Sequence, residues 1–387
     1  MRPMEEMREN NYRICTRCIM DTSDPEIMFD GKGVCNHCRE FDEITRKSWF
    51  AGEEGKKRLS LIINAIKSDG NGNEYDCIIG LSGGIDSSYM AVKVHEWGLR
   101  PLVVHVDAGW NSELAVSNIE KIVKYCDYHL HTHVVNWEEM RDLQLAYLRS
   151  GIANQDVPQD HVFFASMYQF AVKHGIRYIL SGGNIASESI FPKAWHGSAM
   201  DAINLKAIHR KYGERPLNTY TTISFFEYYI WYPFFKKLRT VRPLNYMNYN
   251  KMDAIDELTR AVGWRAYGRK HCESLFTKLF QNYYLPVKFG YDKRRPHLSS
   301  LIVAGQITRE EALHQLDEPL YDKQELEDDI NYFCKKMRIS KKQFNDFISA
   351  PPHHYRDFKN WERNHRWIKK IQTIAERSLG RNLKVYS

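Results

Sequence analysis

Short apolar runs alternate with amphipathic stretches between residues 75 and 184, and this alternation dominates the pattern of the chain. Four runs rich in Ile, Val and Leu are expected as buried strands, because parallel strands covered on both faces read as nearly continuous apolar segments. These runs occupy residues 75–81, 101–106, 130–135 and 176–180. The segments between them predict helices at residues 86–97, 112–125, 137–148 and 160–174.

Strands that alternate with helices predict an α/β fold with a parallel sheet and helices on both faces. Flanking segments extend this picture, with a helix at residues 55–68, an edge strand at 241–244, and a helix at 251–262 that Asn250 is suited to cap. We expect three parts, which are a cysteine-bearing module at residues 1–50, the α/β domain at 51–260, and a mostly helical region at 261–387. No role is assigned to residues 330–387.

A glycine- and serine-rich loop follows the first predicted strand and leads into a helix. It consists of Ser82, Gly83, Gly84, Ile85, Asp86, Ser87 and Ser88. Paired glycines allow close approach of a ligand, and a helix N-terminus with nearby hydroxyl groups favours a phosphate. Asp86 is placed to cap the helix or to hold a metal ion beside the phosphates. The chain has no Walker A motif, and the missing lysine favours chemistry at the α-phosphate of ATP with pyrophosphate leaving.

This loop resembles the signature of the PP-loop ATP pyrophosphatase superfamily, S-G-G-x-D-S followed by Ser or Thr. The resemblance implies that ATP is the substrate and that Asp107, after the second strand, contacts the adenosine. Gly182 and Asn184, with Glu188, resemble the G-S/T-N-x-x-x-E segment of the ammonia-using members, which lies near the adenine and a magnesium ion. Gly183 departs from that segment because it lacks the hydroxyl. A helix-capping role for Asp107 and a solvated carboxylate at Glu188 are the alternatives.

Four cysteines are paired in two short knuckles near the start of the chain. Cys15 and Cys18 form the first C-x-x-C, and Cys35 and Cys38 form the second after sixteen intervening residues. This spacing is typical of a zinc ribbon, and four thiolates leave no open coordination position, so we expect a structural Zn²⁺. An iron–sulfur cluster and free thiols are the alternatives.

Two polar clusters stand in the predicted helical region, at residues 267–274 and 288–300. They combine cations with hydroxyl, imidazole and aromatic groups, as recognition of phosphates and a sugar requires. A plain solvated face is the alternative. The candidate substrate-binding residues are Lys270, Glu273, Arg294, Arg295, His297 and Ser299.

The order of these motifs along the chain resembles that of one family within the PP-loop superfamily. Zinc knuckles, the phosphate loop, Gly-Gly-Asn, Gly-Arg-Lys-His-Cys-Glu-Ser and Lys-Arg-Arg-Pro-His-Leu-Ser together resemble the N-acetyl sugar amidotransferase family, the WbpG type of lipopolysaccharide and O-antigen biosynthesis. The resemblance implies conversion of an acetamido group on a nucleotide-activated sugar to an acetamidino group. An O-adenylyl imidate would form with release of pyrophosphate, and ammonia would then displace AMP.

The resemblance also implies roles for side chains outside the loop. Lys270, Arg294 and Arg295 are candidates to stabilise pyrophosphate or the phosphates of the sugar nucleotide, and His271 and His297 are candidates to relay protons. With Asp86 and Glu188, the catalytic set is Asp86, Glu188, Lys270, His271, Arg294 and Arg295. Mg²⁺ is expected beside ATP.

Composition, charge and signature motifs indicate the expected location and partners of the protein. The net charge is +7, without one long basic run, and no apolar window reaches the length of a membrane span. No export signal is apparent, so we expect a cytoplasmic protein with reduced cysteines. No glutaminase signature is present, and Arg2 stands where an N-terminal-nucleophile glutaminase would carry cysteine. The expected partners are therefore a separate glutaminase and an ammonia-channelling subunit.

Two rival functions remain. A tRNA-modifying PP-loop enzyme, which adenylates and thiolates a base, would also fit zinc knuckles and basic charge. The chain lacks a basic RNA-binding arm and a clear pair of catalytic cysteines outside the knuckles, so no nucleic acid partner is expected. A non-catalytic protein that retains the fold is the other alternative, and the intact loop argues against it.

Overall fold

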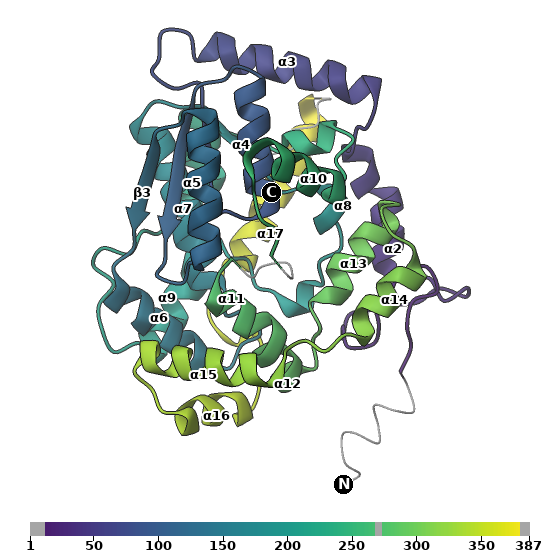
Figure 1. The fold of residues 1–387 in the computed structure, drawn as a ribbon, viewed down its shortest axis with the longest axis vertical. Coiled ribbons are helices and arrows are strands. Elements are labelled where there is room, and N and C mark those ends of the chain that lie inside the picture. Colours follow the sequence, from purple (N-terminus) through teal and green to yellow (C-terminus); the bar gives the residue numbers. More distant parts are fainter. Residues whose placement is uncertain (1–11, 268–272, 380–387) are drawn as a thin grey trace.

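A five-stranded parallel sheet organises the α/β domain, and its edge strand β3 lies on the left in Figure 1. The computed structural model describes residues 12–267 and 273–379. The strand order is β3-β2-β1-β4-β5, and every neighbouring pair is parallel. The strands are β1 (Cys77–Gly80), β2 (Pro101–Asp107), β3 (Leu130–Val134), β4 (Tyr178–Leu180) and β5 (Arg239–Val241). The predicted α/β fold is confirmed.

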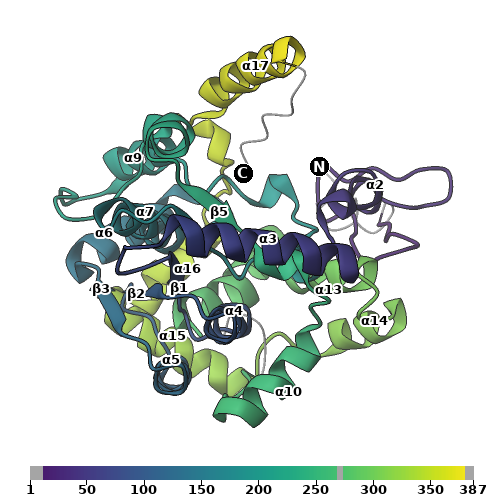
Figure 2. The same ribbon diagram turned by 90° about the horizontal axis from the view of Figure 1, so that it is seen from above.

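Helices cover both faces of this sheet (Figure 2). One face carries α4 (Ile85–Glu96), α5 (Glu113–Cys126) and α10 (Lys251–Val262). The other carries α7 (Val157–Lys173), with α6 (Trp137–Ser150) and α9 (Ala202–Tyr212) packed beside it. Within β1, Ile78 contributes to the core on the α7 side and Ile79 to the core on the α4 side. Such alternation on a sheet buried on both faces explains the continuous apolar runs in the sequence.

The remaining helices come before, between and after the strands in the sequence. Before β1 the chain forms α2 (Asn36–Glu43), η1 (Thr45–Ser48) and α3 (Glu53–Asp69). Between β4 and β5 it forms α8 (Ile185–Glu188), η2 (Lys193–Trp195) and the π-helix η3 (Glu227–Phe235), and η4 (Pro243–Tyr246) follows β5. The C-terminal region is helical, as predicted. It contains α11 (Leu275–Leu279), η5 (Phe280–Tyr284), α12 (Leu285–Phe289), α13 (Arg294–Val303), α14 (Arg309–Asp317), α15 (Lys323–Met337), α16 (Lys341–Ser349), η6 (Tyr355–Asp357) and α17 (Glu362–Leu379).

The edge strand lies two residues earlier than predicted. The sequence predicted residues 241–244, whereas β5 ends at Val241 and Pro243 begins the turn η4. Proline has no amide hydrogen to donate and its φ is fixed, so it stops the ladder at this point.

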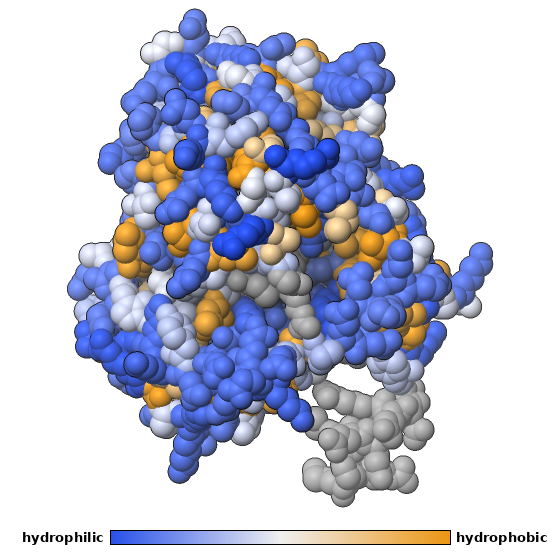
Figure 3. Space-filling view, in the orientation of Figure 1, coloured by the Kyte–Doolittle hydropathy of each residue, from blue (hydrophilic) through white to orange (hydrophobic). Residues whose placement is uncertain are grey.

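The helical C-terminal region packs against the end of β2. Trp110 is 2% exposed and lies against Phe276 and Phe333, with ring centroids 5.5 and 5.6 Å away. In the part of the chain that the structure describes, no helix is long and apolar enough to cross a bilayer. On the face drawn in Figure 3, hydrophobic residues are scattered in small groups among polar ones.

Candidate active site and metal centre

The phosphate loop connects the end of β1 to the first turn of α4. Gly83 has a φ of +82°, and a Cβ at this position would lie 2.7 Å from the carbonyl oxygen of Ala115. Glycine is therefore required both by the backbone conformation and by the contact with α5. The hydroxyl groups of Ser82 and Ser87 are 3.1 Å apart, and that of Ser87 also donates to the carbonyl of Gly84 at 3.0 Å. These bonds hold the loop in a defined curve.

The amides at the start of α4 receive no side-chain cap. The N-cap is Gly84, whereas α5 and α10 begin with side chains, Ser112 and Asn250, that accept from their own first-turn amides. A long helix that begins without a capping side chain leaves its N–H groups available for an anion. Ser88, predicted to contact phosphate, is fully buried, and its hydroxyl has no hydrogen-bond partner among the described residues.

Asp86 lies on the first turn of α4 and is held by two donors. Its Oδ1 accepts from Asn184 Nδ2 at 3.0 Å and from the Tyr249 hydroxyl at 2.6 Å. Burial and the adjacent carboxylate of Asp86 raise the pKa of Tyr249, so this hydroxyl remains protonated and continues to donate. The structure thus fixes the orientation of the carboxylate that the sequence placed beside the phosphates.

The loop after β4 lies directly against the phosphate loop. A Cβ on Gly182 would be 2.6 Å from the carbonyl oxygen of Asp86, so only glycine allows this approach. Asn184 also caps the short helix α8 by accepting from the Ser187 amide. Glu188 is exposed, and its charge contributes to the raised pKa of Tyr249, which places it on the Asp86 side of the site. Two carboxylates beside a phosphate loop are oxygen donors of the kind that Mg²⁺ prefers.

The end of β2 also faces this edge of the sheet. Asp107 Oδ1 accepts from the Gly109 amide at 2.7 Å and from Asn111 Nδ2 at 3.1 Å, so it shapes the turn after the strand. Buried His105, which the sequence did not single out, bonds through Nδ1 to the carbonyl of Leu81 at 2.8 Å and through Nε2 to Asn111 at 2.9 Å. Because the Asn111 amide donates, Nε2 accepts and Nδ1 carries the proton. This histidine couples β2 to the residue that precedes the phosphate loop.

A segment from the C-terminal region crosses the phosphate loop. Trp264 Nε1 and the Tyr267 hydroxyl both donate to the carbonyl of Gly83, at 3.2 and 3.0 Å. Glu273 accepts at its carbonyl from the Ser112 amide at 2.9 Å, and its carboxylate oxygen lies 3.2 Å from where a Cβ on Gly84 would stand. The structure therefore places Glu273 against the phosphate loop. Lys270 and His271 lie outside the described residues.

The four knuckle cysteines converge on one buried point. Their sulfur atoms all lie within 4.8 Å of one another, with Cys15 to Cys38 at 3.9 Å and Cys18 to Cys35 at 3.7 Å. Four sulfurs around a tetrahedral zinc with bonds of about 2.3 Å stand about 3.8 Å apart. The Cys15 sulfur also accepts backbone amides at 3.3–3.4 Å, as thiolates in zinc knuckles do. The donor set fits a structural zinc ion.

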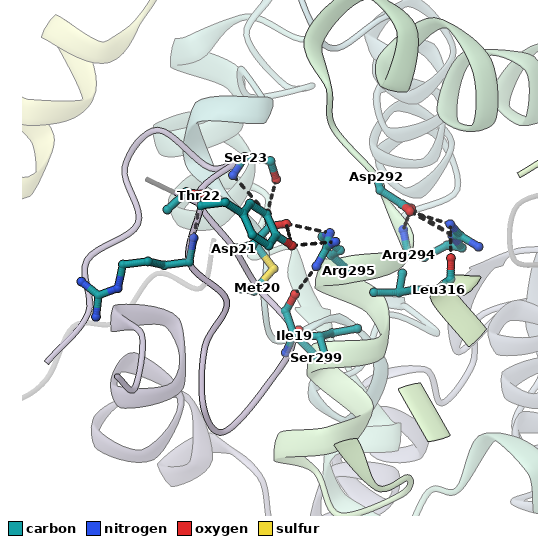
Figure 4. Close-up of polar contacts among 12 residues, drawn as sticks. Ile19, Met20, Asp21, Thr22, Ser23, Asp292, Arg294, Arg295, Ser299 and Leu316 are labelled. Atoms are coloured by element: carbon teal, nitrogen blue, oxygen red, sulfur yellow. Dashed lines mark hydrogen bonds and ion pairs between the residues drawn. The ribbon is translucent and has the colours of Figure 1, made fainter. Parts of the chain in front are cut away.

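The zinc-knuckle module, residues 12–48, docks on α13 and α14 through several side chains (Figure 4). Arg295 pairs with Asp21 at 3.0 Å and donates to the carbonyl of Ile19 at 2.9 Å. Ser299 accepts from the Ile19 amide at 3.2 Å, and Arg309 donates to the carbonyls of both cysteines in the first knuckle. In this structure the donors of Arg295 and the hydroxyl of Ser299 hold the module in place.

Arg294 is likewise engaged with protein. It forms a bidentate pair with Asp292, closest at 2.7 Å, and donates to the carbonyls of Gln315, Leu316 and Glu318. Figure 4 shows Arg294 and Arg295 with separate partners. His297 lies half-buried on the same helix. The sequence predicted a phosphate-binding pair, and the structure engages both guanidinium groups with other parts of the protein.

Comparison with known families adds an independent observation. Residues 273–372 match the family model described as "LPS biosynthesis protein WbpG-like, C-terminal domain". Over these residues the chain is similar to the C-terminal domain of WbpG-like proteins. The predicted resemblance is thus confirmed in the region that carries Glu273 and α13. The matched residues are about a quarter of the chain, and a search among curated proteins finds no match. The WbpG-like domain and the phosphate loop together support an ATP-dependent enzyme.

Solved structures that are similar to this chain include three synthetases. NMN synthetase from Francisella tularensis is 16% identical, with 35% of this chain and 57% of that chain covered and a TM-score of 0.29. NAD+ synthetase from Burkholderia pseudomallei is 16% identical, with 58% and 94% covered and a TM-score of 0.29. A 4-thiouridine synthetase in complex with RNA and bound ATP is 19% identical, with 61% and 53% covered and a TM-score of 0.32.

Proposed function

We propose that the protein is an ATP-dependent amidotransferase that converts an acetamido group of a nucleotide-activated sugar to an acetamidino group. The observation that carries the proposal is that a WbpG-like domain and an S-G-G-I-D-S-S loop occur together in one chain. Glu273, the first residue of that domain, lies against Gly84 of the loop. The reaction belongs to the biosynthesis of O-antigen or a related surface polysaccharide, and the nitrogen comes from ammonia.

In the first half-reaction the amide oxygen of the substrate attacks the α-phosphorus of ATP, and pyrophosphate leaves. Ser82, Gly83, Gly84 and Ser87, with the first-turn amides of α4, would hold the phosphates, and Asp107, Gly182 and Asn184 would face the adenosine. Asp86 and Glu188 would hold Mg²⁺, which neutralises phosphate charge when bound. Since a neutral amide carbon is a poor electrophile, adenylation supplies the leaving group that the second half-reaction needs. Positioning and charge stabilisation then provide most of the catalysis.

In the second half-reaction ammonia forms a C–N bond at the imidate carbon, the C–O bond breaks, and AMP leaves. The carbon receives its nitrogen from outside the chain, so the proposal includes a separate glutaminase with an ammonia-channelling subunit. Lys270 and His271 stay candidates for contacts with phosphate and for proton transfer. The zinc site has a structural role, because four thiolates leave no coordination position open.

The described cysteines argue against the rival thiolation function. Outside the knuckles, Cys77, Cys126 and Cys334 are each 5% exposed or less. Burial raises the pKa of all three thiols, that of Cys126 to about 12, so none is poised as a thiolate that carries sulfur. Cys272 lies outside the described residues.

The decisive experiment follows one oxygen atom. Protein is incubated with ATP, Mg²⁺, ammonium and a panel of UDP-linked acetamido and diacetamido sugars whose acetamido carbonyl carries a heavy-oxygen label. We expect pyrophosphate release, a sugar product in which oxygen is replaced by NH, and transfer of the label to AMP. Asp86→Asn protein serves as the inactive control. No sugar-dependent pyrophosphate release across the panel, or label that stays out of AMP, would refute the proposal.

A further inference from the structure

A second group of charged side chains lies at the carboxyl edge of the sheet, apart from the residues of the proposed ATP site. Asp156 and Asp160 flank the first turn of α7, Lys293 immediately precedes α13, and His196 follows η2. Lys293 is 5% exposed and Asp156 8% exposed. Charged side chains are seldom this buried without partners or a function, because their desolvation is costly.

This group is joined to the phosphate loop by one short segment. Glu273 contacts the phosphate loop, as described above, and the next residue, Ser274, donates to Gln159 Oε1 at 3.5 Å within the first turn of α7. Ser274 also forms a bridge with Asn111, just beyond β2. α13 packs on α8, which carries Glu188. The two groups therefore flank the same chain segment, within reach of one extended ligand.

Several polar atoms in this region lack partners. The Asp160 carboxyl is half-buried and accepts no hydrogen bond in the described part of the chain. Trp195 is 1% exposed, and neither its Nε1 nor His196 Nδ1 has an acceptor among the residues described. The other histidine nitrogen, Nε2, accepts from Lys293 Nζ at 2.8 Å. A buried donor without a partner costs about 1–3 kcal/mol, so Trp195 Nε1 and His196 Nδ1, beside the Asp160 carboxyl, point to a polar ligand.

The protonation states of His196 and Asp160 also suit a polar ligand. Burial, with the charge of Lys293, lowers the pKa of His196 well below its usual value, so the ring is neutral and Nδ1 carries the hydrogen. Burial and the neighbouring Asp156 raise the pKa of Asp160 to about 8, while Lys293 opposes the shift. At neutral pH the Asp160 carboxyl is therefore able to donate as well as accept, which suits hydroxyl and amide groups.

Aromatic rings border the same group. The Phe191 ring stacks on His196 with centroids 3.7 Å apart, and Lys293 Nζ lies 4.6 Å from the Phe191 centroid. Trp195 stacks on Tyr291 at 4.5 Å. Aromatic surface combined with a few convergent polar groups is the composition of a small-molecule site. A pyranose presents both matching features, an apolar C–H face and a rim of hydroxyl and amide groups.

We infer that Asp156, Asp160, Trp195, His196 and Lys293, here called the Asp160 cluster, bind the acetamido-pyranose ring of the substrate. The inference rests on the proposed function, to which it adds the sugar subsite. Asp160 would bond the amide or a hydroxyl of the sugar, and Trp195 and His196 would donate to ring substituents. Asp156 is already held by Thr277 at 2.9 Å and Gln281 at 3.3 Å, and it fixes the shape of the subsite.

The test compares Asp160→Ala with Asp256→Ala, a matched change at an exposed carboxylate on α10. Pyrophosphate release is measured while the UDP-linked acetamido sugar, ATP and ammonium are varied in turn. Calorimetric titrations with the UDP-sugar and with plain UDP separate binding from chemistry. For Asp160→Ala we expect the KM and Kd of the sugar nucleotide to rise roughly tenfold or more, because the alanine side chain can neither donate nor accept the hydrogen bonds that the Asp160 carboxyl offers. The affinities for ATP and UDP should stay within about twofold, and Asp256→Ala should match the unaltered protein.

A second variant guards against a simple folding defect. Trp195→Phe retains an aromatic ring that can stack on Tyr291 but removes the indole N–H together with one of the two fused rings. We expect a smaller rise in the KM of the sugar. An unchanged sugar KM and Kd in both variants would overturn the inference, as would an effect confined to the KM of ammonium. If the UDP-sugar binds and Asp160→Ala weakens that binding, but no pyrophosphate is released, the subsite stands and the proposed reaction fails. If turnover depends on the sugar but is insensitive to substitution of Asp160, the proposed reaction stands and the subsite fails.

Discussion

Asp86 illustrates how individual contacts define the candidate site at the residue scale. Its carboxylate is oriented by Asn184 and Tyr249, which come from loops far apart in the sequence. Asp86→Asn preserves the shape and the acceptor atom but removes the charge. We expect pyrophosphate release to fall by about 10²-fold or more, the usual effect of losing one electrostatic contact in a transition state. The thermal midpoint should change by no more than a few degrees.

The check is the rate of pyrophosphate release together with a thermal melt of the same preparation. Tyr249→Phe is the companion variant, because it removes one donor to Asp86 and leaves the carboxylate. Its loss of activity should be smaller than that of Asp86→Asn. Activity within a few-fold of the unaltered protein in Asp86→Asn would exclude the carboxylate from the proposed metal and phosphate site.

Asp160 makes a separate residue-scale prediction about stability. In the unfolded chain this carboxyl ionises near pH 4, whereas burial holds its folded pKa at about 8. Between these values a rise in pH removes the proton mainly from the unfolded chain, so the free energy of unfolding decreases as pH rises. Asp160→Asn abolishes this penalty, and we expect its thermal midpoint to exceed that of the unaltered protein more at pH 8 than at pH 5. Equal midpoint differences at the two pH values would contradict the buried state of Asp160.

At the scale of elements, α14 helps to hold the zinc knuckles. Arg309 donates to the carbonyls of Cys15 and Cys18 at 3.1–3.3 Å, so Arg309→Met would leave two knuckle carbonyls unpaired. Loss of such buried hydrogen bonds costs about 1–3 kcal/mol. We expect zinc to be extracted by a chelator several-fold faster and the thermal midpoint to fall by a few degrees. The measurement is the time course of zinc release with a colorimetric chelator.

The control is Arg210→Met, which changes an exposed arginine on α9, away from the zinc-knuckle module. Release kinetics identical to those of the unaltered protein in Arg309→Met, with a normal zinc content, would show that the knuckles need no support from α14.

A comparison of the predicted and observed elements shows which features of the structure could be predicted from the sequence. The strands and helices of the α/β domain were predictable because each is encoded locally, by an apolar run or by a cap such as Asn250, which was placed correctly. The docking of Arg295 on Asp21 was not predictable, since 273 residues lie between them and neither has a local signal. Arg294 and Arg295 look like an anion-binding pair in sequence, and only the packing of α13 shows their partners. His105 and Tyr249 were missed for the same reason, because their roles depend on contacts between separate loops.

At the scale of the whole molecule, the proposed function requires a source of nitrogen, which either another protein or this chain would supply. The cysteine-dependent glutaminases use a reactive thiolate, which is found in electropositive and accessible settings. The described cysteines either converge in the zinc knuckles or are buried with raised pKa values. We therefore expect amidine formation with ammonium salts and none with glutamine alone.

The pH dependence of the rate of amidine formation provides a second test of this prediction. Ammonia, and not ammonium, is the nucleophile, so at a fixed total concentration of ammonium salt the rate should rise with pH while NH₃ remains below saturation. When the rate is plotted against the concentration of free NH₃, the curves at different pH values should approach one another. A glutaminase partner that is added with glutamine should restore turnover and make it largely independent of the added ammonium. Turnover with glutamine alone, at a rate comparable to that with ammonium and abolished in Cys272→Ala, would instead assign a glutaminase activity to this chain.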